Sequence, residues 1–488
     1  MKRYYQTLLL SLVIPLWTHG QSTPPATDGA TFTLEQCIQY ALENTVEVKN
    51  ARVDEQISQA RVKETVGIGL PQVDASVGIT HNQKLARFYQ TYDPTQPAFF
   101  DMSQIPGIEP GDVVAFQNFF QLKSSADAGL NINQLLFSST YLVGLKAAST
   151  YKALATKTTE QTKITVVENV TKAYYAVLIN NERVTLFDNN IARVDSLLKT
   201  TRALNENGFA EEIDVDRIQV TLNNLKSEKL KFLNLQSLSL GLLKFQMNYP
   251  MEQALQVTGD ISSIEVKEDL FDDYQEGWEY KNRIEYKLLE TQRDLQKLDI
   301  KNKYSAGMPS LAGFIGLGYS TQSPNIGGLF KTNSGIPETD VVGPDKWYPY
   351  SRFGITLSIP IFSGLQRTYQ VQQAKLTLLK TENSFNSLRQ SIDLSIQQNT
   401  TTFKNSIESL RSQEENMVLA DKVARITKIK YEQGVGSNIE VIDAESSLRE
   451  AQVNYYNALY DAIIAKVDLD KAFAKIDPAQ YTTTTTNK

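Results

Sequence analysis

The sequence predicts a mostly α-helical protein with a small β part, built from two copies of one long-helix unit. Three observations support this fold class. The same landmarks occur twice, in the same order, along the 488 residues. Two long segments without proline carry apolar residues at alternating spacings of four and three. Four short segments alternate apolar with polar residues, which is the pattern of half-buried strands.

The internal duplication is visible at four landmarks. A helical segment that begins at Ala41 matches one that begins at Glu279, and later landmarks match in order: Gly69-Leu70-Pro71 with Gly307-Met308-Pro309, Gly129 through Ser138 with Gly354 through Ser363, and Gly208 through Val215 with Gly434 through Val441. Each half is predicted as helix, strand, loop, strand, long helix, turn and helix. We place the first repeat at residues 21–248, a linker at 249–280 and the second repeat at 281–476.

Each repeat is predicted to contain a very long helix hairpin. Proline costs about 3 kcal/mol inside a helix, and none occurs between Thr140 and Asn248 or between Ile361 and Asp477. Two seams follow the four-three spacing: Val166, Val170, Ala173, Val177, Asn180, Val184, Phe187, Ile191, Val194 and Leu198, and then Ala444, Leu448, Ala451, Tyr455, Ala458, Ala462, Ala465, Leu469, Ala472 and Ile476. Such a period gives a coiled-coil seam. The helix from about Thr140 to Asn205 would reach roughly 100 Å.

The four alternating segments are predicted strands. Their apolar positions are Val73, Ala75, Val77 and Ile79; Ala126, Ala128, Leu130 and Ile132; Leu311, Gly313, Ile315, Leu317 and Tyr319; and Phe353, Ile355, Leu357, Ile359 and Ile361. The segments between the strands of each half, Tyr92–Gly111 and Thr321–Pro349, hold eight of the sixteen prolines and are predicted loops. An ordinary half-buried antiparallel sheet would show the same alternation.

Export favours a membrane location for these strands. Residues 1–20 have the basic start, apolar centre and small-residue end of a secretory signal. No other segment could cross a bilayer as a helix, so a span would require a β-barrel. Aromatic residues cluster near the strand ends, as at membrane interfaces: Phe88, Tyr89, Phe116, Phe119, Phe120, Tyr319, Trp347, Tyr348 and Tyr350. Four strands cannot close a barrel, so several copies must contribute, and three copies would supply about twelve strands.

Composition argues against several functions. The formal net charge is −6, and it falls by two more units if Lys2 and Arg3 leave with the signal, so a nucleic-acid partner is not expected. Cys37 is the only cysteine and is expected to be a small buried residue. The histidines are His19 and His81. No nucleophile–base, phosphate-loop or paired-histidine motif occurs, so neither an enzyme, a cofactor nor a metal site is predicted. Residues 477–488 are predicted to form a disordered tail.

The segment from Tyr431 to Glu445 is the most specific local signal. Gly434 and Gly436 end one helix, as in a left-handed cap, and Ser437-x-x-Glu440 has the pattern of a capping box. This segment, with Ser447–Tyr455 after it, the opening helix Thr33–Asn44 and the junctions Leu136-Phe137-Ser138 and Ile361-Phe362-Ser363-Gly364, resembles TolC-like outer membrane efflux proteins. The resemblance extends from about Thr33 to Ile476.

The resemblance implies a homotrimer in the outer membrane of a Gram-negative bacterium. Its four strands per subunit would form a shared twelve-stranded barrel above a long periplasmic α-helical barrel. It would serve as the exit duct of a tripartite efflux pump or a type I secretion system, receiving substrates from a periplasmic adaptor (membrane fusion) protein and an inner-membrane pump. The alternative that stays open is a secreted or periplasmic coiled-coil protein, structural or adaptor-like, without a pore.

The resemblance also assigns roles at the helix turns. Two turns would dock the adaptor: Gly208, Phe209, Ala210, and Gly434, Val435, Gly436. Glu440 and Asp443 would form the pore constriction, where three copies of each carboxylate would repel one another and attract cations. Tyr431 and Asp214 would tether the tip. A plain capping role for Glu440 is the alternative, worth about 0.3–1 kcal/mol at a helix start. Gly436 stands where some relatives have a basic residue, and Glu211 replaces Ser437 in the first turn.

Overall fold

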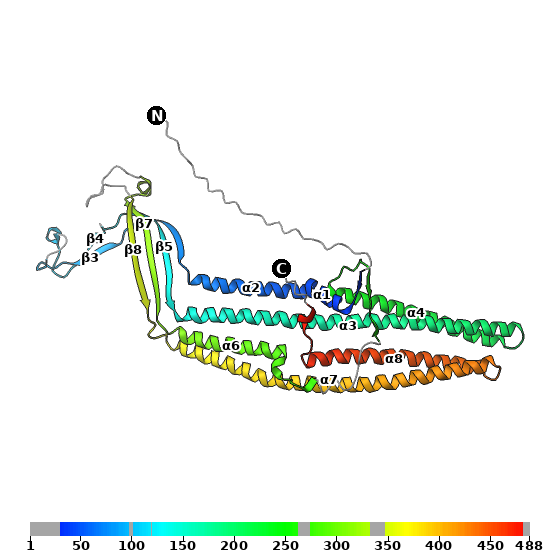
Figure 1. Ribbon diagram of the computed structural model, residues 1–488. Coiled ribbons are helices and arrows are strands. Elements are labelled where there is room, and N and C mark those ends of the chain that lie inside the picture. The colour runs from blue at the N-terminus through cyan, green and yellow to red at the C-terminus, as the bar shows by residue number, and fades with distance from the viewer. Residues whose placement is uncertain (1–29, 97–100, 119, 262–273, 332–346, 482–488) are drawn as a thin grey trace, which may run out of the picture.

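Two long helical hairpins lie side by side, with a four-stranded sheet at one end and both hairpin turns at the other (Figure 1). This computed structural model describes residues 30–96, 101–118, 120–261, 274–331 and 347–481, so the predicted signal lies outside the described residues. The helices are α1 (Leu34–Asn44), α2 (Val46–Ile68), α3 (Ser139–Glu206), α4 (Glu212–Met247), α6 (Ile284–Ser305), α7 (Gln366–Glu432) and α8 (Asn438–Ala472). The strands are β1 (Ala30–Phe32), β2 (Gln72–His81), β3 (Arg87–Thr91), β4 (Val113–Gln117), β5 (Ser124–Ser138), β6 (Leu255–Val257), β7 (Ser310–Ser323) and β8 (Tyr348–Ser358).

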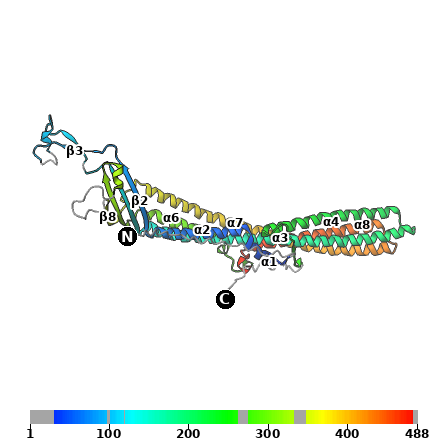
Figure 2. The same ribbon diagram turned by 90° about the horizontal axis from the view of Figure 1, so that it is seen from above.

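The order of elements repeats, as predicted. In the first half, α2, β2, β5, α3 and α4 follow one another, and in the second half α6, β7, β8, α7 and α8 do so. The hairpins α3/α4 and α7/α8 extend together in both views, while α1 lies near mid-length (Figures 1 and 2). The molecule is therefore an elongated rod, with its sheet and its helix turns at opposite ends.

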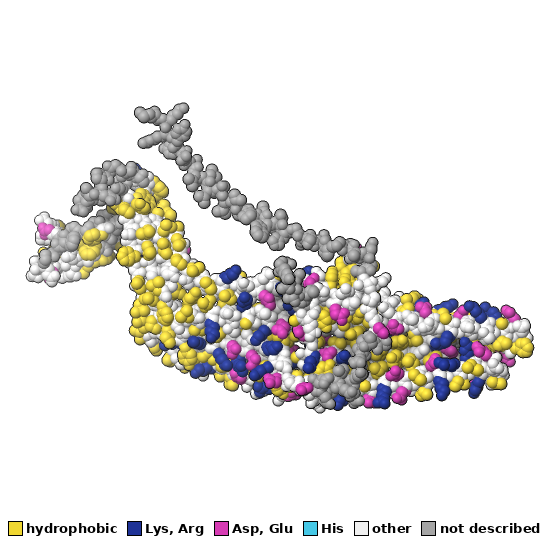
Figure 3. Space-filling view, viewed as in Figure 1, with side chains coloured by type: hydrophobic (Ala, Val, Ile, Leu, Met, Phe, Trp, Pro, Cys, Tyr) yellow, Lys and Arg dark blue, Asp and Glu magenta, His cyan; other side chains and the backbone are white. Residues whose placement is uncertain are grey.

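The four predicted strands form one antiparallel sheet in the order β2-β5-β7-β8. Its register aligns apolar residues across all four strands, for example Val73, Ile132, Ile315 and Phe353. This face is uncovered: Val77 is 76% exposed and Phe353 is 87% exposed. Hydrophobic side chains dominate the sheet in Figure 3, whereas charged side chains are concentrated on the helices. The strands β2 and β8 are the two edges of the sheet.

Two small β pairs were not predicted. The hairpin β3–β4 flanks the predicted loop Tyr92–Gly111, and β1 pairs with β6 inside the predicted linker. Their strands have three to five residues, too few for alternation to be recognised. Phe88, Tyr89 and Phe116 of the predicted aromatic girdle lie in this hairpin and not in the four-stranded sheet.

Most residues of the two predicted helix seams are buried, but Ile476 lies beyond the end of α8 and is not part of the helix. Val170, Val177 and Phe187 of α3 are buried, as are Leu448, Ala462 and Leu469 of α8. The seam of α3 continues into two apolar clusters, one near α1 and one towards the turns. Burying a Val, Leu or Phe side chain contributes about 1.5–3 kcal/mol, so these seams are the main source of hairpin stability.

Helix α1 carries the one cysteine. Thr33 caps this helix, and the Gln36 side chain accepts a hydrogen bond from the Thr33 backbone amide, which completes a capping box. Cys37 lies behind the cap and is fully buried, as predicted. Burial raises the pKa of its thiol to about 12, and the nearby charge of Glu35 adds to the shift. The thiol is therefore protonated at neutral pH.

The C-terminal segment is more ordered than predicted. After α8 the chain forms a 3₁₀ turn at Pro478–Tyr481. Pro478 is buried, and Tyr481 packs against the apolar cluster near α1. The prediction of a disordered tail from residue 477 is thus wrong for these residues, because an apolar proline and an aromatic ring find a packing surface. Residues 482–488 lie outside the described residues.

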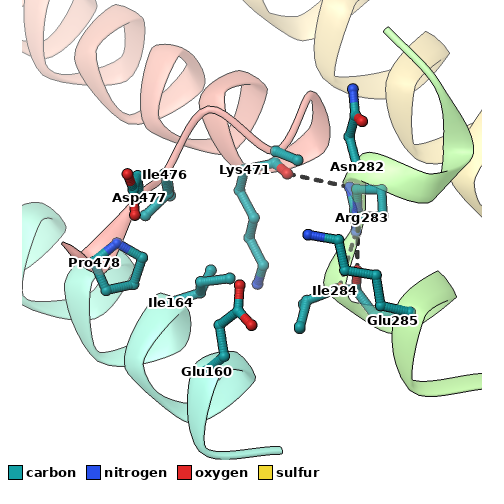
Figure 4. A pocket seen from close by; sticks show the side chains of 12 residues that line it. Glu160, Ile164, Asn282, Arg283, Ile284, Glu285, Lys471, Ile476, Asp477 and Pro478 are labelled. Carbon is teal, nitrogen blue, oxygen red and sulfur yellow. Dashed lines mark hydrogen bonds and ion pairs between the residues drawn. The ribbon is translucent and has the colours of Figure 1, made fainter. Parts of the chain in front are cut away.

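Arg283 joins the start of α6 to the end of α8 (Figure 4). Its Nη1 donates to the carbonyl oxygens of Lys471 and Ala472 at 3.2 and 2.8 Å, and its Nε and Nη2 donate to the Glu285 carboxylate at 3.0 and 3.1 Å. The last carbonyl groups of a helix have no partner within it. Arg283 thus contacts the last two carbonyl groups of α8, beside a cavity of about 300 Å³.

A buried carboxylate joins the two repeats near the same end of α8. Glu168 of α3 accepts hydrogen bonds from Lys172 at 2.9 Å and from Lys471 of α8 at 2.7 Å. Lys172 also pairs with Asp468 of α8. Burial disfavours the charged form of Glu168, but the hydrogen bonds from the two lysines outweigh it and leave the pKa below its ordinary value.

We expect Glu168→Gln to lower the free energy of unfolding by about 2 kcal/mol at pH 7. The two lysines would lose their shared partner, but they are partly exposed, so the loss should be below the roughly 3–5 kcal/mol of a fully buried pair. A carboxyl group whose pKa is lower in the folded than in the unfolded state stabilises the fold at pH values above its unfolded pKa, which is about 4.3 for glutamate. This stabilisation is lost as the pH falls through the folded pKa. The gap to wild type should therefore begin to narrow as pH falls below about 4.

Denaturation of the detergent-solubilised protein would measure this gap. The matched control is Glu408→Gln, because Glu408 is an exposed helical glutamate on α7. An equal loss in both variants, or a gap that stays the same from pH 7 to pH 3, would contradict the ion-network interpretation.

Candidate functional site at the helix turns

The two turns share one backbone geometry. Gly208 and Gly434 have φ of +82° and +74°, in the left-handed region that favours glycine. In each turn the amide of the next residue, Phe209 or Val435, donates to the carbonyl five residues earlier, at 2.8 and 3.0 Å. This is the Schellman pattern of a helix end. The left-handed cap predicted at Gly434 is thus confirmed, and Gly208 has the same geometry.

Both turns present apolar side chains outward. Phe209 is 81% exposed and Val435 is 77% exposed, and they occupy equivalent positions in the two repeats. The Ala210 carbonyl accepts a hydrogen bond from Asn205 at 2.9 Å, which fixes the first turn. A Cβ at Gly436 would lie 3.0 Å from the Tyr431 nitrogen, so glycine allows the second turn to close tightly.

The two predicted tether residues each have a partner in the other hairpin. Tyr431 Oη lies 3.0 Å from Thr201 Oγ1. Asp214 instead accepts hydrogen bonds from Asn438 Nδ2, at 3.1 Å to both its carboxylate and its backbone oxygen. Thr201 and Tyr431 lie near the ends of α3 and α7, and Asp214 and Asn438 lie at the starts of α4 and α8. The chain thus has two separate hydrogen-bonded links between the first hairpin and the second, and the tether role of Tyr431 and Asp214 stays a prediction.

The residues that sequence analysis missed are the partners, Thr201 and Asn438. Thr201 is fully buried and Asn438 is 4% exposed. One signal was available: Thr201 continues the four-three seam after Val194 and Leu198. A polar residue at a seam position needs a hydrogen-bonding partner. Asn438, as the first residue of α8, offered no comparable pattern.

Glu440 and Asp443 are exposed near the start of α8. Within the described chain no ion pair holds either carboxylate. The predicted capping box is not formed, because the Ser437 hydroxyl accepts from the Ile439 amide at 3.3 Å instead of the Glu440 amide, and the Glu440 side chain accepts no bond from the Ser437 amide. Capping therefore does not occupy the Glu440 carboxylate, which is available for another role.

Polar contacts join α3 to α8 behind the turns. Arg193 pairs with Glu445 at 3.2 Å, and Asn190 donates to Gln452 at 3.2 Å. In contrast, α3 and α4 meet through an apolar cluster that includes Phe187, Leu198 and Leu222. The first hairpin is thus held internally by apolar packing. The two hairpins meet near the turns through these polar contacts and through the buried Val441 of α8, which belongs to the same apolar cluster.

These features define a class of protein: an elongated subunit with an exposed apolar sheet at one end and long helical hairpins that project from it. No helix in the described part of the chain is long and apolar enough to cross a bilayer. The chain matches the outer membrane efflux protein family over residues 37–241 and 301–475. It belongs to that family, whose members are outer-membrane ducts rather than enzymes. The family resemblance and the outer-membrane location are thus confirmed.

Similar proteins agree with this assignment. Outer membrane protein TolC of Vibrio cholerae is 22% identical over 353 residues, which cover 72% of this chain and 76% of TolC. The crystal structure of VceC from Vibrio cholerae matches 90% of this chain and 96% of its own, with a TM-score of 0.64 and 14% identity. The open-state MtrE channel of Neisseria gonorrhoeae matches 90% of this chain and 88% of its own, with a TM-score of 0.66 and 16% identity. The chain shares their fold.

Proposed function

We propose that three copies of this chain form one passive exit duct across the outer membrane. The observation that carries the proposal is the uncovered apolar face of a sheet whose edge strands, β2 and β8, each leave one edge unpaired among the described residues. Open edges cannot face lipid. Pairing β2 of one copy with β8 of the next removes both edges and gives a barrel of about twelve strands.

The helices then form a periplasmic tunnel that ends at the turns. Phe209 and Val435, with their glycine neighbours, dock a periplasmic adaptor protein, because exposed apolar side chains on rigid turns suit a protein partner. An inner-membrane pump supplies the energy, and the duct itself carries out no chemistry. Substrates pass from the adaptor and pump to the exterior, in a tripartite efflux pump or a type I secretion system.

The charged and polar residues near the turns form the gate. Glu440 and Asp443 provide the constriction, because three-fold symmetry would place three copies of two unpaired carboxylates near one axis. The links Tyr431–Thr201 and Asn438–Asp214 hold the hairpins together in the closed state. Adaptor binding then shifts the equilibrium towards an open state.

A coiled-coil protein without a pore is disfavoured by the sheet. Such a protein would leave Val73, Val77, Phe353, Ile355 and Leu357 in water, since all are more than half exposed. A soluble protein rarely exposes so large a contiguous apolar patch. Lipid contact explains the patch directly.

Two neighbouring substitutions test the lipid face. We expect Val77→Arg to reduce the heat-labile trimer recovered from outer membranes severalfold, because arginine on the lipid face costs about 2–4 kcal/mol at mid-bilayer. Ser76→Arg is the matched control, since Ser76 lies on the polar face of the same strand, and it should assemble like wild type. Fractionation and electrophoresis without heating would measure both. A wild-type chain that purified as a monomer without detergent would contradict the proposal.

A further inference from the structure

Three consecutive pairs on the polar face of the sheet combine a glycine with a large planar side chain. In the β7–β8 register, Phe314 stands opposite Gly354, Arg352 opposite Gly316, and Tyr350 opposite Gly318. Each planar group lies over its glycine. A Cβ on Gly354 would lie 2.7 Å from Phe314 Cζ, and a Cβ on Gly316 would lie 2.8 Å from Arg352 Nε.

The first two glycines differ from the third. The atoms that a Cβ would meet first at Gly354 and Gly316 all belong to side chains. At Gly318 a Cβ would also lie 2.6 Å from the Ala128 carbonyl oxygen, so the backbone itself requires glycine there. Because Gly316 and Gly354 have no side chain, the side chains of Arg352 and Phe314 can lie flat against the sheet.

On the opposite, apolar face, a glycine has no such neighbour. Gly313 lies on the same strand as Gly316, and a Cβ there would make only an ordinary contact with Leu136, at 3.5 Å. In the β7–β8 pair, planar side chains thus lie over glycines on the polar face, and Gly313 on the apolar face is not covered in this way. In the proposed trimer this face lines the lumen, so each flattened side chain would recur three times around it.

We propose that Gly316 and Gly354 set the aperture of the exit barrel by holding Arg352 and Phe314 flat against its wall. This inference rests on the proposed function. A planar group that lies flat adds little more than its own thickness to the wall, whereas an upright arginine or phenylalanine projects towards the axis. The width of a pore and the groups that line it decide which solutes pass. The barrel is accordingly built to release bulky solutes, and these two positions set their upper size.

A rival explanation is packing alone. Cross-strand pairs of an aromatic or long side chain with its neighbour also stabilise a sheet, by about 0.2–1 kcal/mol. Packing alone predicts that a valine at either position changes stability and leaves the aperture unchanged. The aperture and the stability must therefore be measured separately.

The test uses Gly316→Val and Gly354→Val in trimers reconstituted into planar bilayers. Because the acidic constriction lies at the far end of the duct, the aperture should be probed from the barrel side, with polyethylene glycols of graded mass added there. The smallest polymer excluded from the lumen marks the aperture. We expect that mass to fall about twofold in each variant, since a displaced side chain would narrow the lumen at three places.

Two rescue variants and one control complete the design. Gly316→Val combined with Arg352→Ser, and Gly354→Val combined with Phe314→Ser, should restore the wild-type cut-off, because the displaced side chain is gone. Gly313→Val, on the apolar face, should leave it unchanged. An unchanged cut-off in both glycine variants, or failure of both rescues in trimers that still assemble, would overturn the inference. A wild-type protein that forms no channel would instead overturn the proposed function.

Discussion

Replacing Glu440 by Gln and Asp443 by Asn is expected to remove most of the cation preference of the duct. Both carboxylates are exposed and unpaired in the described chain, and the capping box that would have occupied Glu440 is not formed. In a trimer, six carboxylates would surround the narrowest part of the tunnel. Rings of acidic side chains favour cations in a pore, so neutral isosteres should bring the permeability ratio of K⁺ to Cl⁻ close to one.

The reversal potential in a salt gradient across a planar bilayer would measure this ratio. Glu211→Gln is the matched control, because Glu211 is an exposed acid at the start of α4 that makes no capping bond. It removes one charge per chain at the same end of the molecule and should leave the ratio nearly unchanged. A cation preference that survived in the double variant would exclude Glu440 and Asp443 as the selectivity ring.

Sequence periodicity was sufficient to predict the long elements. The four-three spacing located α3 within one or two residues, because a seam of many turns repeats the same signal. Alternation located β2, β5, β7 and β8. It also assigned residues to the two faces of the sheet, because successive side chains in a strand point to opposite faces. Only the register, however, revealed that glycines and planar side chains stand opposite each other on the polar face.

Contacts between distant segments could not be predicted in the same way. Tyr431 and Thr201 are separated by 230 residues, and no local pattern specifies which of several nearby polar groups becomes the partner. The capping box failed for a related reason. The pattern Ser437-x-x-Glu440 permits two reciprocal bonds, but the serine hydroxyl reaches the Ile439 amide instead. Thr33 and Gln36, which were not singled out for this motif, form both bonds.

Removing the two links between the hairpins is expected to open the tip. In Tyr431→Phe/Thr201→Val, both hydroxyls are replaced by apolar groups of similar shape, so no buried donor is left unpaired. Asn438→Ala removes both bonds to Asp214. A net hydrogen bond contributes about 0.5–1.5 kcal/mol, so the triple variant should shift the closed–open equilibrium by about 1–3 kcal/mol, or roughly 5- to 150-fold.

Single-channel recording would detect this shift as a higher open probability and a larger mean conductance. The two links lie on different helices, Tyr431 near the end of α7 and Asn438 at the start of α8, and share no partner atom. Their effects should therefore add approximately in free energy. Asn223→Ala is the control, because Asn223 accepts a hydrogen bond from Gln219 within α4 only, and its loss should not affect the gate. If the triple variant kept wild-type conductance, polar contacts further back, such as Arg193–Glu445 at 3.2 Å, would have to hold the hairpins closed.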